Sequence, residues 1–329
     1  MRHKTKVFAL VGFFFLLIVL FFIFKVFKKV PIDKLIKIGI IQLVEHEALD
    51  DARCGFIEEL GKLGYKDNEN IKINYQNAQG DQSVCNLIAN KLIRDNSDLI
   101  FAISTPCAQA VSNLTKDIPI LITAVTDPES ANLVKSNQRP YKNVTGTSDL
   151  VPIEKQIKLI TRLNNKIKKI AILYGSSEVS SKYQADIALK EAEKLGLQAQ
   201  IFTASNSNDM QQITENISKN FEAVYLPTDN LTNSCMPTIY QTTMKNNIFI
   251  VCSEITIVNK GAIGTYGVVY DELGKMTARQ AVKILKKEST PQNMPIEYSI
   301  DNSKLVLNWD VINKLNIKVT EDLKLESEQ

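Results

Sequence analysis

Histidine and tryptophan are scarce in this chain of 329 residues, which contains two histidines and one tryptophan. Its five cysteines form no Cys-x-x-Cys pair and no spacing typical of a metal site. Because structural zinc sites combine cysteine with histidine, and His3 and His46 each stand alone, the sequence predicts no bound metal. We expect no other cofactor either.

The sequence also gives little indication of disulfide bonds. An odd number of cysteines leaves at least one free thiol if every disulfide forms within the chain. Cys54 with Cys85 is the one disulfide that we consider. For most of the five, the favoured interpretation is a small buried apolar side chain.

The chain also has no large excess of positive or negative charge. The 39 lysines and arginines are nearly balanced by 36 aspartates and glutamates, which leaves a net charge of +3. Lysines are spread along the chain and do not gather with aromatic residues, so we expect no nucleic-acid surface. The hydrophobic fraction of 44% is ordinary and predicts a real core. Residues 36–329 are enough for one large domain or two ordinary ones.

What the chain does have is a long apolar run near its N-terminus. Residues 7–24 are all apolar or small and follow Arg2, Lys4 and Lys6. The run approaches the roughly 20 residues that span a bilayer as a helix, and exceeds the roughly 7–15 of a removable secretory signal. No small-x-small cleavage site or early lipid-accepting cysteine follows it. The sequence therefore predicts an uncleaved signal anchor, a transmembrane helix with its linker in residues 1–35, and cleavage is the alternative. Basic residues flank both ends, so charge alone leaves the orientation open.

Beyond the anchor, short apolar runs alternate with segments of helical period. The runs predict strands at 36–41, 71–75, 98–103, 118–123, 169–174, 198–202, 223–226, 248–251 and 264–267. Helices are predicted at 49–63, 81–93, 106–114, 152–162, 180–195 and 210–218, with caps at Asp50 or Asp51, Asp81 and Thr105. This alternation predicts an α/β fold with parallel sheets covered by helices on both faces.

The pattern pauses at residues 143–149 and then starts again, which predicts two doubly wound lobes joined by a hinge. Residues after Tyr270 are too few for a third domain and must pack back onto the first two. We expect residues 36–148 with about 271–298 to form lobe 1. Residues 149–270 with about 299–329 would form lobe 2.

Polar residues that follow the predicted strands are the candidates for a ligand site. Ligands of open parallel sheets bind beyond the carboxyl ends of the strands, and two facing lobes make a shared cleft that a hinge can close. The candidates are Gln42, Glu45, Ser104, Thr105, Thr123 and Ala124 in lobe 1, and Tyr174, Thr228, Asp229, Glu254 and Tyr266 in lobe 2.

The segment Ser104-Thr105 precedes a helix that begins near Pro106. A helix N-terminus favours a carboxylate or phosphate through its unpaired N–H groups and its dipole. We therefore expect this segment, together with Thr123, to hold a ligand carboxylate. The alternative is that Thr105 only caps its own helix.

The second lobe offers acids in equivalent places. Asp229 and Glu254 each follow a short apolar strand and can hold a ligand ammonium through charge-assisted hydrogen bonds. The alternative for Asp229 is to cap a helix that starts near Leu231. Tyr174 and Tyr266 would supply flat walls for a ligand side chain, with ordinary strand-end packing as the alternative.

Catalysis has weaker support. Glu45 with His46, and Cys107 at a helix start, are the only candidates for a catalytic group. The sequence marks no nucleophile, base and third partner together, so we expect a binding protein and not an enzyme.

Seven stretches of the chain together resemble the ABC transporter substrate-binding proteins of the tryptophan/tyrosine-type uptake systems, which have a type I periplasmic-binding-protein fold. They extend over about residues 36–310 and comprise 38–42 with 44–46, 74–82, 105–106, 123–128, 143–146 with 148–149, 227–230 and 265–267. Two departures stand out. Cys107 occupies a position where the family has alanine, and Cys235 is unusual near the cleft.

The resemblance implies capture of a small ligand outside the cytoplasm and its delivery to an ABC permease with its ATPase. The ligand would be an aromatic amino acid: tryptophan, tyrosine or phenylalanine. This places the soluble portion on the extracytoplasmic (periplasmic) side of the cell membrane. By the same resemblance, Thr105 and Thr123 would contact the ligand carboxylate. Asp229 and Glu254 would contact its amine. Glu45, Tyr174 and Tyr266 would flank its side chain.

The alternative function is a ligand-sensing receptor ectodomain of the same fold. Such a receptor needs an output domain across the membrane. Only six residues precede Val7, which are too few for such a domain, so we expect no output domain. The role as a component of an importer is therefore favoured.

Overall fold

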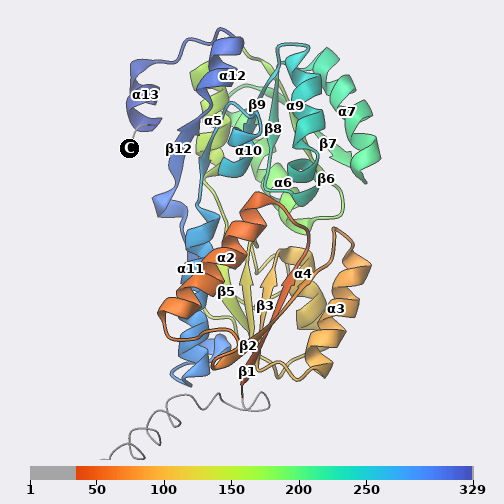
Figure 1. The fold of residues 1–329 in the computed structure, drawn as a ribbon. Coiled ribbons are helices and arrows are strands. Elements are labelled where there is room, and N and C mark those ends of the chain that lie inside the picture. The colour runs from red at the N-terminus through yellow and green to blue at the C-terminus, as the bar shows by residue number, and fades with distance from the viewer. Residues whose placement is uncertain (1–34, 328–329) are drawn as a thin grey trace, which may run out of the picture.

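The computed structural model describes residues 35–327, which form two lobes (Figure 1). The strands of the first sheet are β1 (Ile36–Gln42), β2 (Ile71–Asn77), β3 (Leu99–Ile103), β4 (Ile120–Thr123), β5 (Val144–Ser148) and β11 (Glu297–Tyr298). Those of the second are β6 (Lys169–Gly175), β7 (Gln198–Ala204), β8 (Ala223–Leu226), β9 (Phe249–Cys252), β10 (Gly264–Gly267) and β12 (Lys304–Leu307).

Both sheets follow the same winding pattern. Their strand orders are β11-β5-β4-β3-β1-β2 and β12-β10-β9-β8-β6-β7. All neighbours pair in parallel except β12, which runs antiparallel to β10. The predicted α/β class with two parallel-sheet lobes is confirmed.

Helices cover both faces of each sheet. In lobe 1, α2 (Glu47–Lys62) packs on α11 (Tyr270–Leu285) on one side, while α3 (Gln82–Arg94) packs on α4 (Thr105–Leu114) on the other. In lobe 2, α5 (Ile153–Leu163) packs on α6 (Val179–Lys194), and α7 (Ser207–Asn220) on α9 (Met236–Met244). The shorter helices are α8 (Asn230–Ser234), α10 (Ile255–Asn259), α12 (Trp309–Lys314), α13 (Glu321–Ser327) and the 3-10 turns η2 (Pro291–Asn293) and η3 (Ile300–Asn302).

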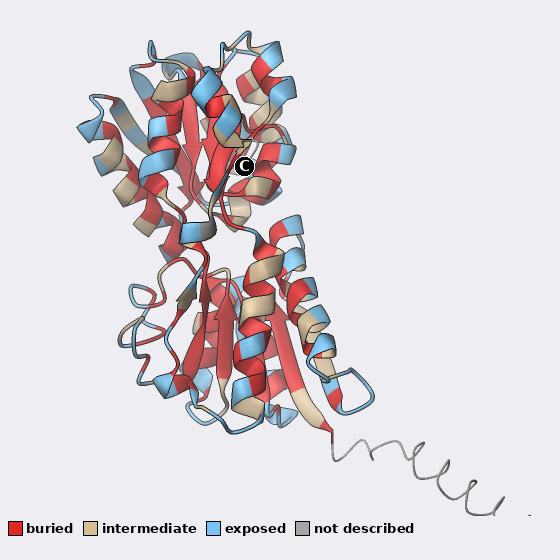
Figure 2. Ribbon diagram, turned by 90° about the vertical axis from the view of Figure 1, so that its left-hand side faces the viewer, coloured by how far each residue is buried: buried red, intermediate tan, exposed pale blue. Residues whose placement is uncertain are grey.

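The cores lie between the sheets and these helices, as the continuous buried strands in Figure 2 show. All five residues of β3 are buried, and Phe101 stacks on Phe56 of α2 with ring centroids 4.0 Å apart. Central parallel strands that are buried on both faces are expected to be apolar throughout. This explains why the sequence marks them clearly.

The strand β5 was not predicted, because residues 143–149 were interpreted as a pause. Its sequence, Val-Thr-Gly-Thr-Ser, is short of large apolar side chains, yet all five residues are buried. Gly146 lies so close to β4 that a Cβ atom there would meet the backbone oxygen of Ile122 at 2.0 Å. A close backbone approach therefore takes the place of apolar packing at this strand.

The predicted helix caps are partly correct. Asp81 caps α3, because its side chain accepts hydrogen bonds from the N–H groups of Ser83 and Val84. The helix α2 begins earlier than expected, so Asp50 and Asp51 lie inside it. At α4 the cap position belongs to Ser104, and Thr105 is the first helical residue.

The chain passes between the lobes three times, after β5, after β10 and after β11. As expected, the segments that follow Tyr270 pack back onto both lobes: α11 and β11 join lobe 1, and β12 joins lobe 2. A division of the chain near residues 148, 270 and 298 remains our proposal.

Within residues 35–327 no helix is both long and apolar enough to cross a membrane. The predicted anchor at residues 7–24 lies outside the described range.

Candidate functional site

The carboxyl ends of the strands of both sheets meet at a cleft between the lobes. Its deepest part, here called the inner cavity, encloses about 10 Å³, which is about the space of one water molecule. Its lining residues are His46, Leu49, Thr105, Ala124, Thr126, Asp149, Glu178, Ser180, Thr228, Asn230, Glu254 and Tyr270.

A larger space, here called the outer vestibule, adjoins the inner cavity and shares Glu178 and Asn230 with it. Its volume is about 420 Å³, within the range of roughly 300–1,000 Å³ that is usual for ligand pockets. Leu43, Val44 and Pro106 come from lobe 1, and Leu231 and Cys235 are among its lobe 2 residues.

Direct hydrogen bonds hold the two lobes together at the inner cavity. The hydroxyl oxygens of Thr105 and Ser180 lie 2.6 Å apart, and the side chain of Gln184 donates to Thr126 over 2.9 Å. His46 contacts Asn230 at 2.9 Å. Because each pair joins lobe 1 to lobe 2, the structure describes a closed cleft.

Three carboxyl groups point into this closed space. Asp149, Glu178 and Glu254 are 1%, 8% and 2% exposed. Burial raises the pKa of all three, and the pKa of Glu254 reaches about 8 because Asp149 adds like-charge repulsion. Among the described residues that line the inner cavity, none is a lysine or arginine. The cavity is thus an acidic site without its own cation.

Lys260 is the cation that acts on Glu254 from behind the cavity wall. Its ammonium donates to the side-chain oxygen of Asn233 over 2.7 Å, and the Asn233 amide donates to Glu254 over 2.7 Å. The amide therefore separates the lysine from the carboxylate, and Lys260 lowers the pKa of Glu254 less than burial raises it.

Two buried acceptors of the inner cavity have no hydrogen-bond partner in the part of the chain that is described. One is Oδ1 of Asp149, whose Oδ2 accepts a bond from the Tyr270 hydroxyl at 2.8 Å. The other is Nδ1 of His46. Buried polar atoms are nearly always paired, so two orphan acceptors in one cavity indicate that a donor belongs there.

The state of His46 follows from its neighbours. Burial lowers its pKa to about 4, so the ring is neutral at pH 7. The Asn230 amide nitrogen donates to Glu178, which turns the Asn230 oxygen toward His46 and makes Nε2 of His46 the donor. The lone pair of Nδ1 is therefore free to accept.

Hydrogen-bond donors gather on another side of the cavity. The helices α4 and α6 come from opposite lobes and begin face to face, joined by the Thr105–Ser180 contact. The first turns of helices leave N–H groups without intrahelical partners and carry the positive end of the dipole. Ser104, the cap residue of α4, does not line the cavity itself but has a buried hydroxyl without a partner among the described residues. This side of the cavity favours a carboxylate.

The backbone is strained at two places beside the cavity. Ser104 has a φ of +91° directly after β3, and Ala124 has a φ of +53° directly after β4. Such conformations cost about 1–3 kcal/mol each in residues with a Cβ atom and cluster at functional sites. They support the cleft as the functional part of the molecule.

The structure brings part of the predicted site together. Thr105, Ala124, Thr228 and Glu254 line the inner cavity. Ser104 is buried beside them but does not line it.

Two lobe 1 candidates lie away from the cavity and have partners of their own. Gln42 is buried and bonds to the side chains of Asp50 and Arg53. Thr123 bonds to Thr147 inside lobe 1. A third, Glu45, is exposed and lines neither the inner cavity nor the outer vestibule.

The remaining lobe 2 candidates also point elsewhere. Asp229 caps α8, as the alternative interpretation proposed, and both of its oxygens are occupied by Thr232, Gly175 and Ser181. The hydroxyl of Tyr266 bonds to Arg162 and Glu326, away from the cleft. Tyr174 is buried in the lobe 2 core.

Sequence reasoning missed most of the acids and their partners. Asp149 and Tyr270 lie at the crossings between lobes, and Glu178 lies just before α6. Two features of the sequence could have identified these acids as site residues. Asp149 belongs to the resembling stretch 148–149, and Glu178 lies in the loop that follows β6. Asn230 lies in the resembling stretch 227–230 after a predicted strand but was not selected as a site residue. Ser180 is a helical residue, which strand-end reasoning does not select.

The groups considered for catalysis have no suitable surroundings. Cys107 is fully buried, and burial raises its thiol pKa well above the ordinary value, which disfavours the nucleophilic thiolate. Glu45 is exposed while His46 is turned toward Asn230.

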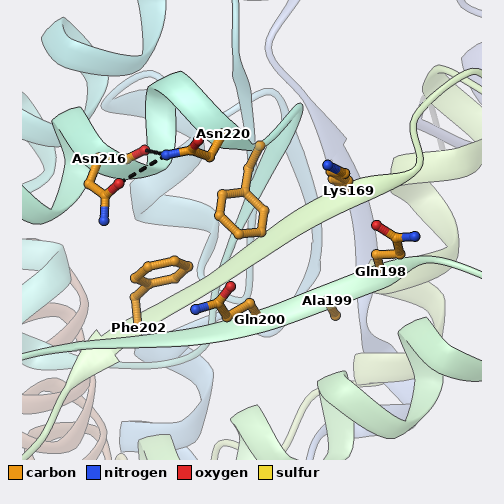
Figure 3. Close-up of a pocket in the computed structure, with 8 residues that line it drawn as sticks. Lys169, Gln198, Ala199, Gln200, Phe202, Asn216 and Asn220 are labelled. Carbon is orange, nitrogen blue, oxygen red and sulfur yellow. Dashed lines mark hydrogen bonds between the residues drawn. The ribbon is translucent and has the colours of Figure 1, made fainter.

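A separate groove of about 440 Å³ lies on the outer side of lobe 2, along the edge strand β7 (Figure 3). Side-chain amides surround it, and the rings of Phe202 and Phe221 meet edge to face at 5.2 Å. Asn220 donates to Asn216 across one wall. None of the candidate residues lines this groove, and it contains no carboxyl group.

Comparisons with known proteins concern the family and the fold of the chain. A family model described as ABC transporter substrate binding protein matches residues 37–329. The tyrosine-binding protein of Clostridioides difficile (strain R20291) is 42% identical over 291 residues, which cover 88% of this chain and 84% of the relative.

Two solved structures provide a comparison of shape. The ABC domain from Streptococcus pneumonia in complex with L-Trp is 33% identical with a TM-score of 0.86, and the match covers 89% of this chain and 98% of that one. The ligand-free, open structure of a substrate-binding protein with adhesive properties from Clostridium difficile is 44% identical with a TM-score of 0.68. That match covers 87% of this chain and 96% of the other.

Proposed function

Since the chain belongs to the family of ABC transporter substrate-binding proteins, we propose that it captures an aromatic amino acid between its lobes for an ABC importer. The observation that carries this proposal is the inner cavity. It combines orphan acceptors and buried acids in one part with helix N-termini and hydroxyls in another. An amino-acid zwitterion carries the complementary pair of charges.

The ligand ammonium would occupy the acidic part of the cavity. Asp149 Oδ1 and His46 Nδ1 would each accept one of its hydrogen bonds, and the carboxylate of Glu254 would supply compensating charge. Asp229, selected from the sequence for this role, has its oxygens occupied within lobe 2. We therefore assign the role to Asp149 in its place.

The ligand carboxylate would lie where α4 and α6 begin. Thr105 and Ser180 bond to each other in the structure, and each hydroxyl can turn to a ligand when the lobes separate. The side chain would extend toward the outer vestibule, where Leu43, Val44 and Pro106 face Leu231. Tyrosine and tryptophan in the names of two relatives support an aromatic ligand.

Binding would require movement of the lobes, because an enclosed space of about 10 Å³ cannot admit an amino acid. The chain matches the L-Trp complex better in shape than the open ligand-free relative, although it is more identical in sequence to the latter. This supports hinge closure around the ligand, with the ligand stabilising the closed state because only that state completes both sets of contacts.

The remaining steps follow from the family. The closed form would deliver the amino acid to a permease and its ATPase on the extracytoplasmic side of the membrane, with residues 7–24 as the proposed anchor. The chain would act as a binding protein and catalyse no reaction, as expected for a relative of proteins named for binding.

Calorimetry of the full-length protein against the twenty amino acids tests this function. We expect binding of tyrosine, tryptophan or phenylalanine, and an affinity about 10- to 100-fold weaker in Asp149→Asn, since a hydrogen bond to a charged group contributes about 1.5–3 kcal/mol. Tyr266→Phe is the matched control, because its hydroxyl bonds away from the cleft, and should bind as wild type. Absence of amino-acid binding, or an unchanged affinity in both Asp149→Asn and Glu254→Gln, would overturn the proposal.

A further inference from the structure

Two thiols on neighbouring helices lie beside each other behind the cavity wall. Cys85 belongs to the first turns of α3 and Cys107 to the first turn of α4, and their sulfur atoms are 3.5 Å apart. The sequence suggested Cys54 as the partner of Cys85, but Cys54 is exposed on α2, and the sulfur next to Cys85 is that of Cys107.

The other thiols have different surroundings. Cys252 is directed at the backbone oxygens of Glu254 and Gly264, and Cys235 lines the outer vestibule. Within residues 35–327, Cys85 and Cys107 are the one pair of sulfur atoms in contact. We propose that Cys85 and Cys107 form a disulfide that ties α3 to the first turn of α4.

The geometry makes this bond accessible with a small movement. A disulfide has a sulfur–sulfur distance of about 2.05 Å, so the two atoms must approach by about 1.5 Å. Both thiols lie near helix N-termini, where the dipole favours thiolates, but at Cys107 burial outweighs this and raises the thiol pKa. The helices α3 and α4 already pack on each other, so side-chain rotation with a slight helix shift closes the gap.

Cys85 is the residue that an oxidant reaches first. It is buried under the N-terminal end of α3, where the cap residue Asp81 and the helical residues Gln82 and Ser83 are exposed, and helix ends open most readily. The hydrogen bond with Cys107 also lowers the pKa of the Cys85 thiol, while burial raises that of Cys107. Cys85 is therefore the attacking thiol and Cys107 the resolving one.

The reaction is thiol–disulfide exchange with an external disulfide. Cys85 loses its proton to solvent, and its thiolate attacks one sulfur of the oxidant disulfide. A mixed disulfide forms at Cys85, the oxidant's own sulfur–sulfur bond breaks, and its other sulfur leaves as a thiolate that takes up a proton. Cys107 then loses its proton and attacks the Cys85 sulfur, releasing the second thiol of the oxidant. Two electrons pass from the protein thiols to the oxidant disulfide.

The bond would act on the wall of the ligand cleft. Cys107 lies two residues after Thr105, which lines the inner cavity. The disulfide would fix the first turn of α4 against α3 and restrict the unfolded chain between residues 85 and 107. A loop of this length typically gives a melting temperature higher by about 5 °C or more in a protein of this size.

Oxidised glutathione with the full-length protein tests the proposal. After unfolding and alkylation, we expect the number of reactive thiols to fall from five to three, with a Cys85–Cys107 cross-linked peptide in the mass spectrum. The melting temperature should rise by about 5 °C and return after reduction. Five reactive thiols after oxidation, or a cross-link of Cys85 to Cys54, would overturn the proposal.

Three variants separate the pair from the other thiols. Cys54→Ser should still lose two reactive thiols on oxidation. In the Cys54→Ser background, which lacks the exposed thiol, Cys85→Ser should lose none. In the same background Cys107→Ala, which places a smaller side chain in the buried position, should trap a glutathione mixed disulfide at Cys85. If Cys85→Ser does not fold, the mixed disulfide in Cys107→Ala is the deciding measurement. An unmodified Cys85 in that variant would contradict the assignment of Cys85 as the attacking thiol.

Discussion

Glu254 carries an unusual electrostatic cost, because it is buried with two other acids and no cation lines their cavity in the described structure. Its pKa of about 8 means that the closed ligand-free cleft keeps a proton on this carboxyl at neutral pH. In the unfolded chain a glutamate releases its proton near pH 4.3. The native form therefore binds more protons than the unfolded chain between about pH 4.5 and 8.

This difference predicts the pH dependence of stability. The contribution of Glu254 is present at low pH and is lost as pH rises to about 8, with a slope of at most about 1.4 kcal/mol per pH unit. Glu254→Gln carries no titrating proton and should lack this slope. Urea unfolding of both proteins between pH 5 and 8.5, without ligand, measures the difference. Parallel pH profiles would show that Glu254 keeps its ordinary pKa.

The sequence predicted site residues best just beyond the ends of strands, because the direction of the strand alone brings such a residue to the cleft. Thr105 and Glu254 each lie two residues after the end of a strand, β3 and β9, and reach the cavity. Tyr174 and Tyr266 also lie at strand ends, but a side chain there can turn to either face of the sheet, and both turn away from the cavity. The orientation depends on packing partners far away in the sequence, such as Glu326 for Tyr266.

The contact between α2 and α11 shows how closely two elements approach when glycines face each other. A Cβ atom on Gly274 would meet the backbone oxygen of Ala52 at 2.0 Å, and one on Gly55 would meet that of Asp271 at 2.2 Å. Both contacts are with backbone atoms, so neither helix can yield without shifting as a whole. Because α11 also carries Tyr270, this contact positions one wall of the inner cavity.

Gly274→Ala should therefore destabilise the protein by about 2 kcal/mol or more, as overpacking typically does. Gly61→Ala is the matched control, since Gly61 is also helical and a Cβ atom there would meet nothing within 4 Å. That change should stabilise the protein by up to about 1 kcal/mol, because alanine favours the helix. Urea unfolding of both variants compares them, and a similar effect of the two substitutions would contradict the close contact.

Alternating apolar runs and helical periods predicted nine of the twelve strands in the described part of the chain, and β5, β11 and β12 are the exceptions. The runs at β1, β3 and β6 are rich in isoleucine and leucine because these strands are buried on both faces. In β5 the space is filled by neighbouring backbone at Gly146 and by hydroxyl groups such as Thr145, which bonds to the backbone of Met294. Neither feature is visible in a pattern of hydrophobicity.

The buried acids of the cleft oppose closure of the two lobes unless a positively charged group is enclosed between the lobes at the same time. Closing the lobes removes Asp149, Glu178 and Glu254 from water, and desolvated carboxylates without a cation are unfavourable. A ligand ammonium would remove this penalty. The same acids that bind the ligand therefore disfavour the empty closed form increasingly as the pH rises toward 8, because Glu254 must keep its proton to stay buried without a cation.

Small-angle X-ray scattering of the full-length protein measures this. At pH 8 we expect a smaller radius of gyration with a bound aromatic amino acid than without it. The variant Asp149→Asn/Glu254→Gln should be more compact than wild type when both are empty, because two of the three ionised groups are replaced by neutral amides. An equal radius for wild type with and without saturating ligand would contradict the proposed closure.

The three passages of the chain between the lobes make the two halves inseparable by simple truncation. The sheet of lobe 1 takes its edge strand β11 from residues 297–298, and lobe 2 takes β12 from residues 304–307. A shortened polypeptide that ends before residue 297 would leave both sheets with an exposed edge. A single proteolytic nick in one passage, in contrast, would leave the halves connected by the other two.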